Sequence, residues 1–284
     1  MAEVKAPNVL EKPGDYTLKE IVLVNSIGEK FDIKPFVLEL NIYENIYQHT
    51  MIGNLVMTDI GNLVNLVPLQ GNERLYFKVQ TPGATGQSEM IDMSDESGHA
   101  FIVTRLSDRK EISDRAHSYI LHFGTKEHIR NLRTRVSQAY DGPLEHGVLS
   151  MIHDEAYLNS QKQVFFEPTR NKDKIVIGNK RPFAAIDMIC SKALSQNGKG
   201  AGYFFYETTK GFHFRSWESM VAYQANVDPK DQNAELLELT TKTQLTPNKQ
   251  GRLPENQLAI DSYSFPINFD TEYMQGSGAY SQKV

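Results

Sequence analysis

Apolar residues stand at every second position in two neighbouring segments of the chain, with polar residues between them. The first segment contains Leu38, Leu40 and Ile42, and the second contains Leu55 and Met57. A period of two is typical of half-buried strands, because successive side chains of a strand point to opposite faces. The pattern predicts two strands, and the repetition of such strands at short spacing favours a β-barrel.

Further strands are predicted where apolar runs end in turn residues. They cover 21–24, 31–33, 75–80, 100–106 and 118–123. Gly, Ser, Asp and Glu dominate the stretch 81–98, which predicts a solvated loop. The first domain is therefore expected to be almost entirely β and to end near residue 124.

The hydrophobic period changes after this point, which indicates helices. Ile129, Leu132 and Val136 are spaced by three and four residues and predict a helix over 126–140, with Thr125 as its cap. Further elements are predicted as helices at 145–158 and 182–194 and as a hairpin of 201–207 with 211–215. These elements predict a small α/β domain over about 125–220.

Composition narrows the classes of partner. The 284 residues include 30 basic and 35 acidic ones, a formal net charge of −5, so no strong field favours nucleic acid or anionic lipid as a primary partner. The single cysteine, Cys190, lies in an apolar helical pattern and is expected to be a buried, unreactive thiol. No apolar window is long enough for a membrane span, so we expect a protein made in the cytoplasm and soluble until it assembles.

Several blocks, taken in order, resemble a known family. The strand blocks 39–46, 51–59 and 68–73 resemble the first tube-forming barrel of baseplate hub proteins of T-even-like contractile-tailed phages. The later motifs 135–142, 181–187, 202–206 and 211–214 resemble the domain inserted between two barrels in that family, which includes late control D proteins and the core of type VI spike proteins. Residues 276–284 are similar to the point where the second barrel begins.

This resemblance implies a mixed β and α+β fold, with an antiparallel β-barrel tube domain, an inserted small α/β domain and the start of a second barrel. The implied division is an N-terminal arm (1–17), the first barrel (18–124), the inserted domain (125–220), a crossover (221–257) and an apparently incomplete second barrel (258–284). It also implies a non-enzymatic homotrimer in the virion baseplate. Its partners would be the tail spike, the tail tube and other baseplate proteins, with DNA passing through transiently and no membrane insertion.

In such a hub, open edge strands of neighbouring subunits pair and so close a ring. The unpaired backbone N–H and C=O groups of each edge form hydrogen bonds with the next subunit. The candidates for the edge between subunits are Leu38, Leu40, Ile42, Leu55 and Met57, and the candidates for the polar bore are Asn54, Thr58 and Asn62.

The sequence predicts no catalytic, cofactor or metal site. The histidines do not have the spacing of a metal site. His117 and His122 fall on opposite faces of one strand, and His146 and His153 are two helical turns apart. Two alternatives stay open. One is a tail-tip protein that binds or hydrolyses cell-wall carbohydrate, and the other is a sixfold distal tail or tube-terminator ring.

The carbohydrate alternative depends on acidic and aromatic side chains. Glu155, Glu167 and Asp187 are spare carboxylates for hydrolysis. The hairpin aromatics suggest a sugar-stacking platform: Tyr203, Phe205, Tyr206, Phe212, Phe214 and Trp217. Alternate members of this set are more simply explained as the core beneath the helix that begins at Pro182.

Overall fold

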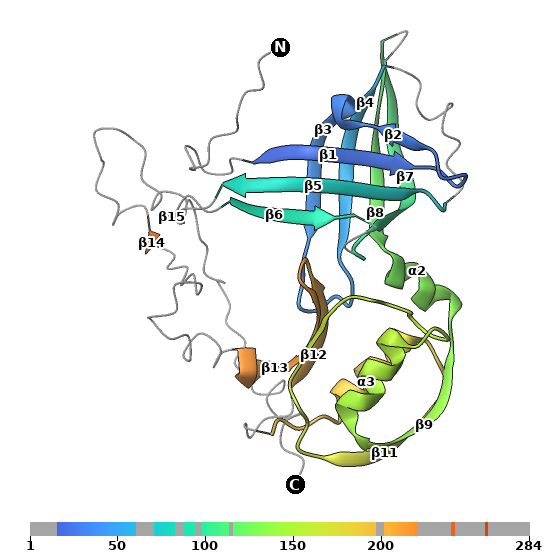
Figure 1. Ribbon diagram of the computed structural model, residues 1–284, viewed down its shortest axis with the longest axis vertical. Helices are drawn as coiled ribbons and strands as arrows, with labels where there is room; N and C mark the ends of the chain where they lie inside the picture. Colours follow the sequence, from blue (N-terminus) through green and yellow to red (C-terminus); the bar gives the residue numbers. More distant parts are fainter. Residues whose placement is uncertain are drawn as a thin grey trace, which may run out of the picture.

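The computed structural model shows a mostly antiparallel β protein with few helices, an α+β fold (Figure 1). It describes residues 16–60, 71–82, 88–94, 98–113, 116–196, 202–220, 240–241 and 259–260. The N-terminal arm up to residue 15, nearly all of the predicted crossover and second barrel, and Asn62 lie outside these residues. None of the described helices is long and apolar enough to cross a membrane.

Eight strands form the main sheet, in the order β2-β1-β5-β7-β8-β4-β3, with β6 added to β5. Their bounds are β1 (Thr17–Val24), β2 (Lys30–Asp32), β3 (Val37–Tyr43), β4 (Ile52–Asp59), β5 (Arg74–Pro82), β6 (Ser88–Met93), β7 (Phe101–Ser113) and β8 (Ala116–Thr125). Figure 1 shows β1, β5 and β6 crossing β3, β4, β7 and β8 as a second layer. The described ends of the sheet, β2 and β3, do not pair with each other, so closure of the predicted barrel stays a prediction.

Alternating side chains from both layers form the first hydrophobic core. Ile21, Leu55, Phe77 and Phe123 are among its fully buried members. A 3-10 helix, η1 (Lys34–Phe36), carries the chain from β2 in one layer to β3 in the other. Burial of alternate positions explains why the period of two in the sequence predicted these strands.

The remaining elements follow β8 in the chain, and all of them except α2 contribute side chains to a second hydrophobic core. They are α2 (Lys126–Arg133), β9 (Val136–Pro143), α3 (Leu144–His153), β10 (Val164–Phe166), β11 (Lys172–Lys180), α4 (Pro182–Cys190), β12 (Tyr203–Thr208) and β13 (Gly211–Ser216). The helices α3 and α4 pack with a three-stranded sheet, β10-β13-β12, and with the β9-β11 pair, and the two cores share no residue. A short parallel pair, β14 (Thr240–Thr241) and β15 (Ala259–Ile260), is also described.

Two predictions about these elements are wrong. The predicted helix over 126–140 ends at Arg133, and Val136–Tyr140 belongs to β9, paired with β11 about forty residues later. The predicted loop at 81–98 contains β6, which pairs with β5. In both cases a distant or adjacent strand supplies backbone partners that outweigh the local preference. Thr125 precedes α2, but its side chain makes no capping hydrogen bond.

Candidate functional site

The strand β3 lies at one end of the main sheet. In the described residues β3 pairs only with β4, so its other edge has no strand partner. Leu40 and Ile42 are half-buried against the first core, whereas Leu38 is 65% exposed. The β3–β4 register shifts between Val37 and Glu39, and this bulge turns Leu38 outward although its sequence period matches that of Leu40.

Leu55 and Met57 do not lie on an edge, and this part of the prediction is wrong. Both belong to β4, which pairs with β3 on one side and with β8 on the other. Their side chains are fully buried in the first core. A period of two identifies the side chains that face the core, but it does not identify which strand stands at the end of a sheet.

Asn54 and Thr58 lie on the opposite, partly exposed face of β4. Asn41 donates a hydrogen bond from Nδ2 to Asn54 Oδ1 (3.0 Å), and Asn54 Nδ2 donates to the Tyr43 hydroxyl (3.2 Å). These bonds make a polar row across β3 and β4. Two of the residues predicted to line a bore, Asn54 and Thr58, therefore lie on one polar, partly exposed face of β4. The third, Asn62, lies outside the described residues.

The same polar face continues onto β7 and β8. His122 is the register partner of Asn54, and its Nε2 lies 2.8 Å from Ser107 Oγ and 3.2 Å from Arg105 Nη2. Because arginine only donates, Nε2 accepts and the ring is neutral. Burial, together with the Arg105 charge, lowers the pKa of His122, which agrees with this arrangement.

A second open edge, which the sequence prediction missed, runs along β7. β5 pairs with β7 at Phe101 and Ile102, and the Val103 N–H donates to the Glu73 carbonyl oxygen (2.9 Å). Beyond Val103, the far edge of β7 pairs with no described strand. Ile112 near its end is 60% exposed. The sequence prediction ended this strand at 106, whereas β7 continues to Ser113.

A buried ion cluster ties the two halves of the molecule together. The Lys162 ammonium donates to Glu127 Oε2 (2.9 Å) and to Glu207 Oε1 (2.5 Å), and all three side chains are fully buried. Glu207 Oε2 accepts the backbone N–H of Met51, just before β4 (2.9 Å). Ser160 Oγ donates to Glu127 Oε1 (2.6 Å). The cluster thus joins elements that follow β8 to the main sheet.

The protonation states of this cluster follow from burial and charge. Although burial disfavours its charged form, the carboxylates of Glu127 and Glu207 raise the pKa of Lys162. Burial raises the pKa of Glu207 to about 7, against the opposing effect of Lys162. The Lys162 side chain is therefore held in its charged form, and the pKa of Glu207 is close to neutral pH.

The β3–β4 loop makes further contacts across the same junction. His49 Nε2 lies 2.7 Å from Asp187 Oδ1, and the imidazole stacks on Phe183 with the ring centroids 5.1 Å apart. The backbone N–H of Thr209 donates to Glu44 Oε1 (2.6 Å). The end of the main sheet and the hairpin β12–β13 therefore meet side by side, as Figure 1 also shows.

The three carboxylates considered for hydrolysis have different partners, and two of them are engaged by other side chains or backbone groups. Glu167 accepts hydrogen bonds from Ser195 Oγ and the Ser216 N–H, and Asp187 pairs with His49. Glu155 is exposed, and its backbone carbonyl accepts from Arg130. Within the described residues no three His, Cys, Asp or Glu side chains are grouped as metal ligands would be.

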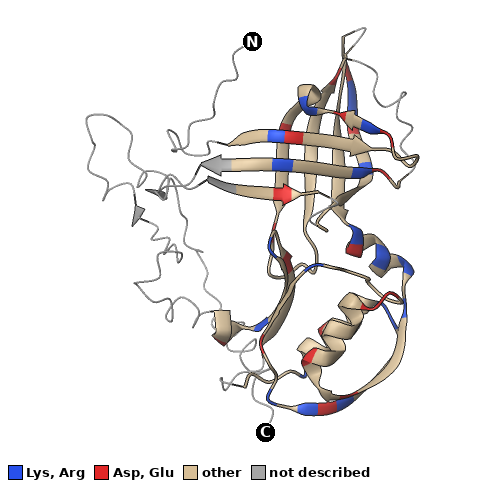
Figure 2. Cartoon of the chain, viewed as in Figure 1, with Lys and Arg blue, Asp and Glu red and all other residues tan. Residues whose placement is uncertain are grey.

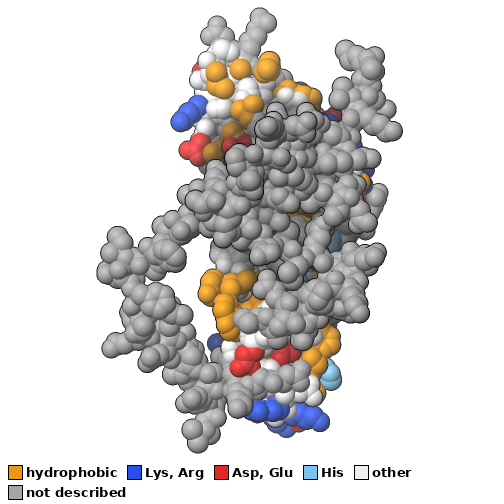
Figure 3. Space-filling view, turned by 90° about the vertical axis from the view of Figure 1, so that its left-hand side faces the viewer, with side chains coloured by type: hydrophobic (Ala, Val, Ile, Leu, Met, Phe, Trp, Pro, Cys, Tyr) orange, Lys and Arg blue, Asp and Glu red, His pale blue; other side chains and the backbone are white. Residues whose placement is uncertain are grey.

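The hairpin aromatics divide between core and surface, as the simpler explanation predicted. Four of them are buried in the second core: Tyr203, Phe205, Phe212 and Phe214. Trp217 is 54% exposed, and Tyr206 stacks on His213 at 4.9 Å on the outer face. Hydrophobic side chains also reach the surface in both the upper and lower parts of the molecule (Figure 3).

Comparisons with known proteins reveal distant structural likeness only. No protein-family model and no curated protein matches the sequence. The prophage tail protein gp18 from Listeria monocytogenes EGD-e is 13% identical, with a TM-score of 0.44 over 70% of this chain and 51% of that one. The 43 kDa tail protein of prophage MuSo2 from Shewanella oneidensis is 11% identical, with a TM-score of 0.40 over 69% and 54%.

A third solved structure belongs to a secretion system. The E. coli c3393 protein is described as a type VI secretion component with structural similarity to the T4 tail proteins gp27 and gp5; it is 8% identical, with a TM-score of 0.39 over 70% of this chain and 48% of that one. The chain spans about half the length of the structures it matches. Its structural neighbours are thus phage tail proteins and a type VI secretion component.

Proposed function

We propose that this protein is a non-enzymatic structural subunit of a contractile phage tail. In this proposal it sits in the baseplate hub, as a homotrimer between the central spike and the tail tube. The ordered sequence blocks that resemble hub proteins motivate the proposal, and one structural observation carries it. In the four-stranded layer β7-β8-β4-β3, no described strand pairs with the far edge of β3, and β5 pairs with β7 only at Phe101 and Ile102.

The directions of β3 and β7 allow these two edge strands to pair between copies of the chain. Each neighbouring pair in the layer is antiparallel, so β3 and β7 run in opposite directions. In a ring of copies related by rotation, β3 of one copy meets β7 of the next, and the pairing is again antiparallel. A head-to-tail ring of this kind satisfies both rows of unpaired backbone groups.

The edges are also complementary in charge. β3 carries Glu39, whereas the open part of β7 carries Arg105, Arg109 and Lys110 beside Asp108 and Glu111. An acidic edge and a net basic edge favour the head-to-tail contact over contacts between like edges. The polar face with Asn54 and Thr58 would line the channel and keep it wet for passing DNA.

Cross-linking between variants that each add one cysteine tests the ring contact. Glu39→Cys places a thiol on β3, and Arg109→Cys places one on β7. The native Cys190 stays silent, because it is buried and burial raises its pKa. With a short bismaleimide, a mixture of the two variants should give covalent dimers, whereas either variant alone should not.

Two results of this experiment would count against the proposal. Cross-linking of Glu39→Cys with itself would indicate a two-fold β3–β3 contact, which closes a dimer and not a ring. An equal yield for Glu39→Cys mixed with Lys172→Cys, an exposed site on β11, would mean that the reaction reports collisions and not an interface.

Copy number tests the assignment to a trimeric hub. Quantitative mass spectrometry of purified tail particles should find about three copies per particle, as threefold closure requires. About six copies would favour a tube or terminator ring. Absence from the particle would overturn the structural role.

A further inference from the structure

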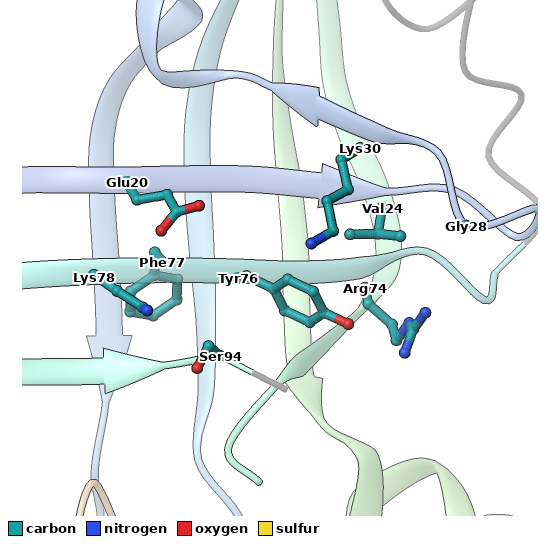
Figure 4. Close-up of a pocket in the computed structure, with 9 residues that line it drawn as sticks. All are labelled: Glu20, Val24, Gly28, Lys30, Arg74, Tyr76, Phe77, Lys78 and Ser94. Atoms are coloured by element: carbon teal, nitrogen blue, oxygen red, sulfur yellow. The ribbon is translucent and has the colours of Figure 1, made fainter. Parts of the chain in front are cut away.

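The outer face of the small sheet β10-β13-β12 is aromatic, unlike the main sheet. On the main sheet, a cavity of about 320 Å³ over β1 and β5 is lined by side chains of both signs (Figure 4), and Figure 2 shows charged residues on β1, β5 and β6. On the small sheet, alternate residues point away from the second core and are half-buried. Three of them are rings that stack across the strands as register partners: Phe165, His213 and Tyr206.

This stack of three rings carries no charge at neutral pH. Each outer ring has its centroid 4.9 Å from that of His213, and His213 Nε2 lies 2.9 Å from Thr208 Oγ1. Burial, together with the charges of Arg215 and Lys210, lowers the pKa of His213 to about 4. The imidazole is therefore neutral, and the sheet beneath the exposed rings is an ordered, uncharged support.

Two exposed rings, Tyr47 and Trp217, contact the next outward residue of β12, Phe204. The Phe204 centroid lies 5.9 Å from that of Tyr47 and 6.1 Å from that of Trp217. Tyr47 is 75% exposed and Trp217 is 54% exposed. Backbone hydrogen bonds hold both residues, because the Tyr47 N–H donates to Asn45 Oδ1 and the Trp217 N–H donates to the Gly202 carbonyl oxygen (both 2.9 Å). One half-buried ring thus supports two exposed rings in defined positions.

Each exposed ring also has a polar edge. Neither the Tyr47 hydroxyl nor the Trp217 indole N–H makes a hydrogen bond to another described residue, so both can bind a ligand. Proteins that stack nucleic-acid bases add a positively charged groove to such rings. Here the loop 44–50 and the residues 202–220 carry two charges of each sign besides the buried Glu207: Lys210, Arg215, Glu44 and Glu218. This balance favours an uncharged ligand.

We propose that the aromatic face formed by Tyr47, Phe204 and Trp217 binds a neutral, β-linked oligosaccharide. The equatorial substituents of such pyranose rings leave both ring faces apolar, and these C–H faces stack on Tyr47 and Trp217. Sugar hydroxyl groups hydrogen-bond with the Tyr47 hydroxyl and the indole N–H. The site uses none of the residues of the proposed β3–β7 contact, so it goes beyond the proposed role in the tail.

The fluorescence of Trp217 tests this site directly, because it is the only tryptophan in the sequence. Titration of the full chain with chitohexaose or cellohexaose should move the emission to shorter wavelength, since a stacked sugar displaces water from the indole. Isothermal titration calorimetry measures the same binding without depending on tryptophan.

Variants locate the binding. Tyr47→Ala should weaken it by about tenfold, as expected for loss of a central aromatic contact. Trp217→Ala should abolish the binding heat, and Trp217→Phe, which keeps a ring, should retain part of it. Tyr16→Ala is the matched control, because this tyrosine is 60% exposed and precedes β1 in the main sheet; it should bind as the wild type does. Thermal unfolding of each variant checks the fold.

Four outcomes would overturn the inference. Neither a fluorescence shift nor heat with both sugars would exclude a glycan site. Equal affinity of the wild type and Tyr47→Ala would exclude this face. A shift of the emission on raising the protein concentration without sugar would show that a second copy covers the face. Tighter binding of a single-stranded oligothymidine than of either sugar would assign the rings to base stacking.

Discussion

Lys162 is the side chain on which the junction depends most. It is fully buried between Glu127 and Glu207. Lys162→Met leaves two carboxylates buried without their cation, which should cost about 3–5 kcal/mol of unfolding free energy. Urea denaturation measures this loss, and Lys172→Met, at an exposed position, provides the control. A loss below about 1 kcal/mol would contradict the ion cluster as described.

Glu207 should make stability depend on pH in a defined window. Its pKa is raised to about 7 in the folded protein, so between roughly pH 4.5 and 7 the folded state binds more protons than the unfolded state. The stabilising contribution of Glu207 is therefore present below this window and is lost as the pH rises through it.

Comparison with Glu207→Gln isolates this effect. The unfolding free energy of the wild type minus that of the variant should be smaller at pH 8 than at pH 5. The exposed Glu155→Gln should show no such trend. A constant difference across the range would show that Glu207 does not titrate there.

At the scale of elements, the contact between β3, β4 and β8 is tightest at Gly53. A Cβ at this position would lie 2.3 Å from Phe123 Cζ and 2.4 Å from the Asn41 carbonyl oxygen. Gly53→Ala must push β4 from its neighbours and should destabilise the fold by about 1–3 kcal/mol. Gly178→Ala on β11, where nothing lies within 4 Å, is the matched control in the same denaturation experiment. Equal stability of both variants would contradict this packing.

At the scale of the whole molecule, we expect a substitution on the open edge of β3 to prevent self-association. Loss of an exposed apolar side chain elsewhere should not. Leu38→Lys places a charge on β3, and lysine on an edge strand discourages pairing. Light scattering should show that this variant stays monomeric under conditions in which the wild type associates. Val176→Lys changes a residue of β11 that is 71% exposed and should associate normally. Equal effects of both changes would favour non-specific association.

Local sequence pattern was sufficient for many elements of this protein, although not for β6 and β9. Side-chain period depends on residues a few positions apart, so the pattern around Leu40 and Leu55 was sufficient to predict β3 and β4, and the hairpin β12–β13 was predicted equally well. The pattern also predicted that alternate aromatic residues of that hairpin belong to the core, as they do.

Which strand stands at an edge and which charges are buried depend on pairing between distant segments. Leu55 and Met57 became interior because β8, some sixty residues later, pairs with β4, and a bulge turned Leu38 outward. Lys162, Glu127 and Glu207 come from three distant segments, and no local pattern marks them. Such choices depend on the free energy of long-range pairing and burial, which is summed over the whole chain and not carried by any one segment.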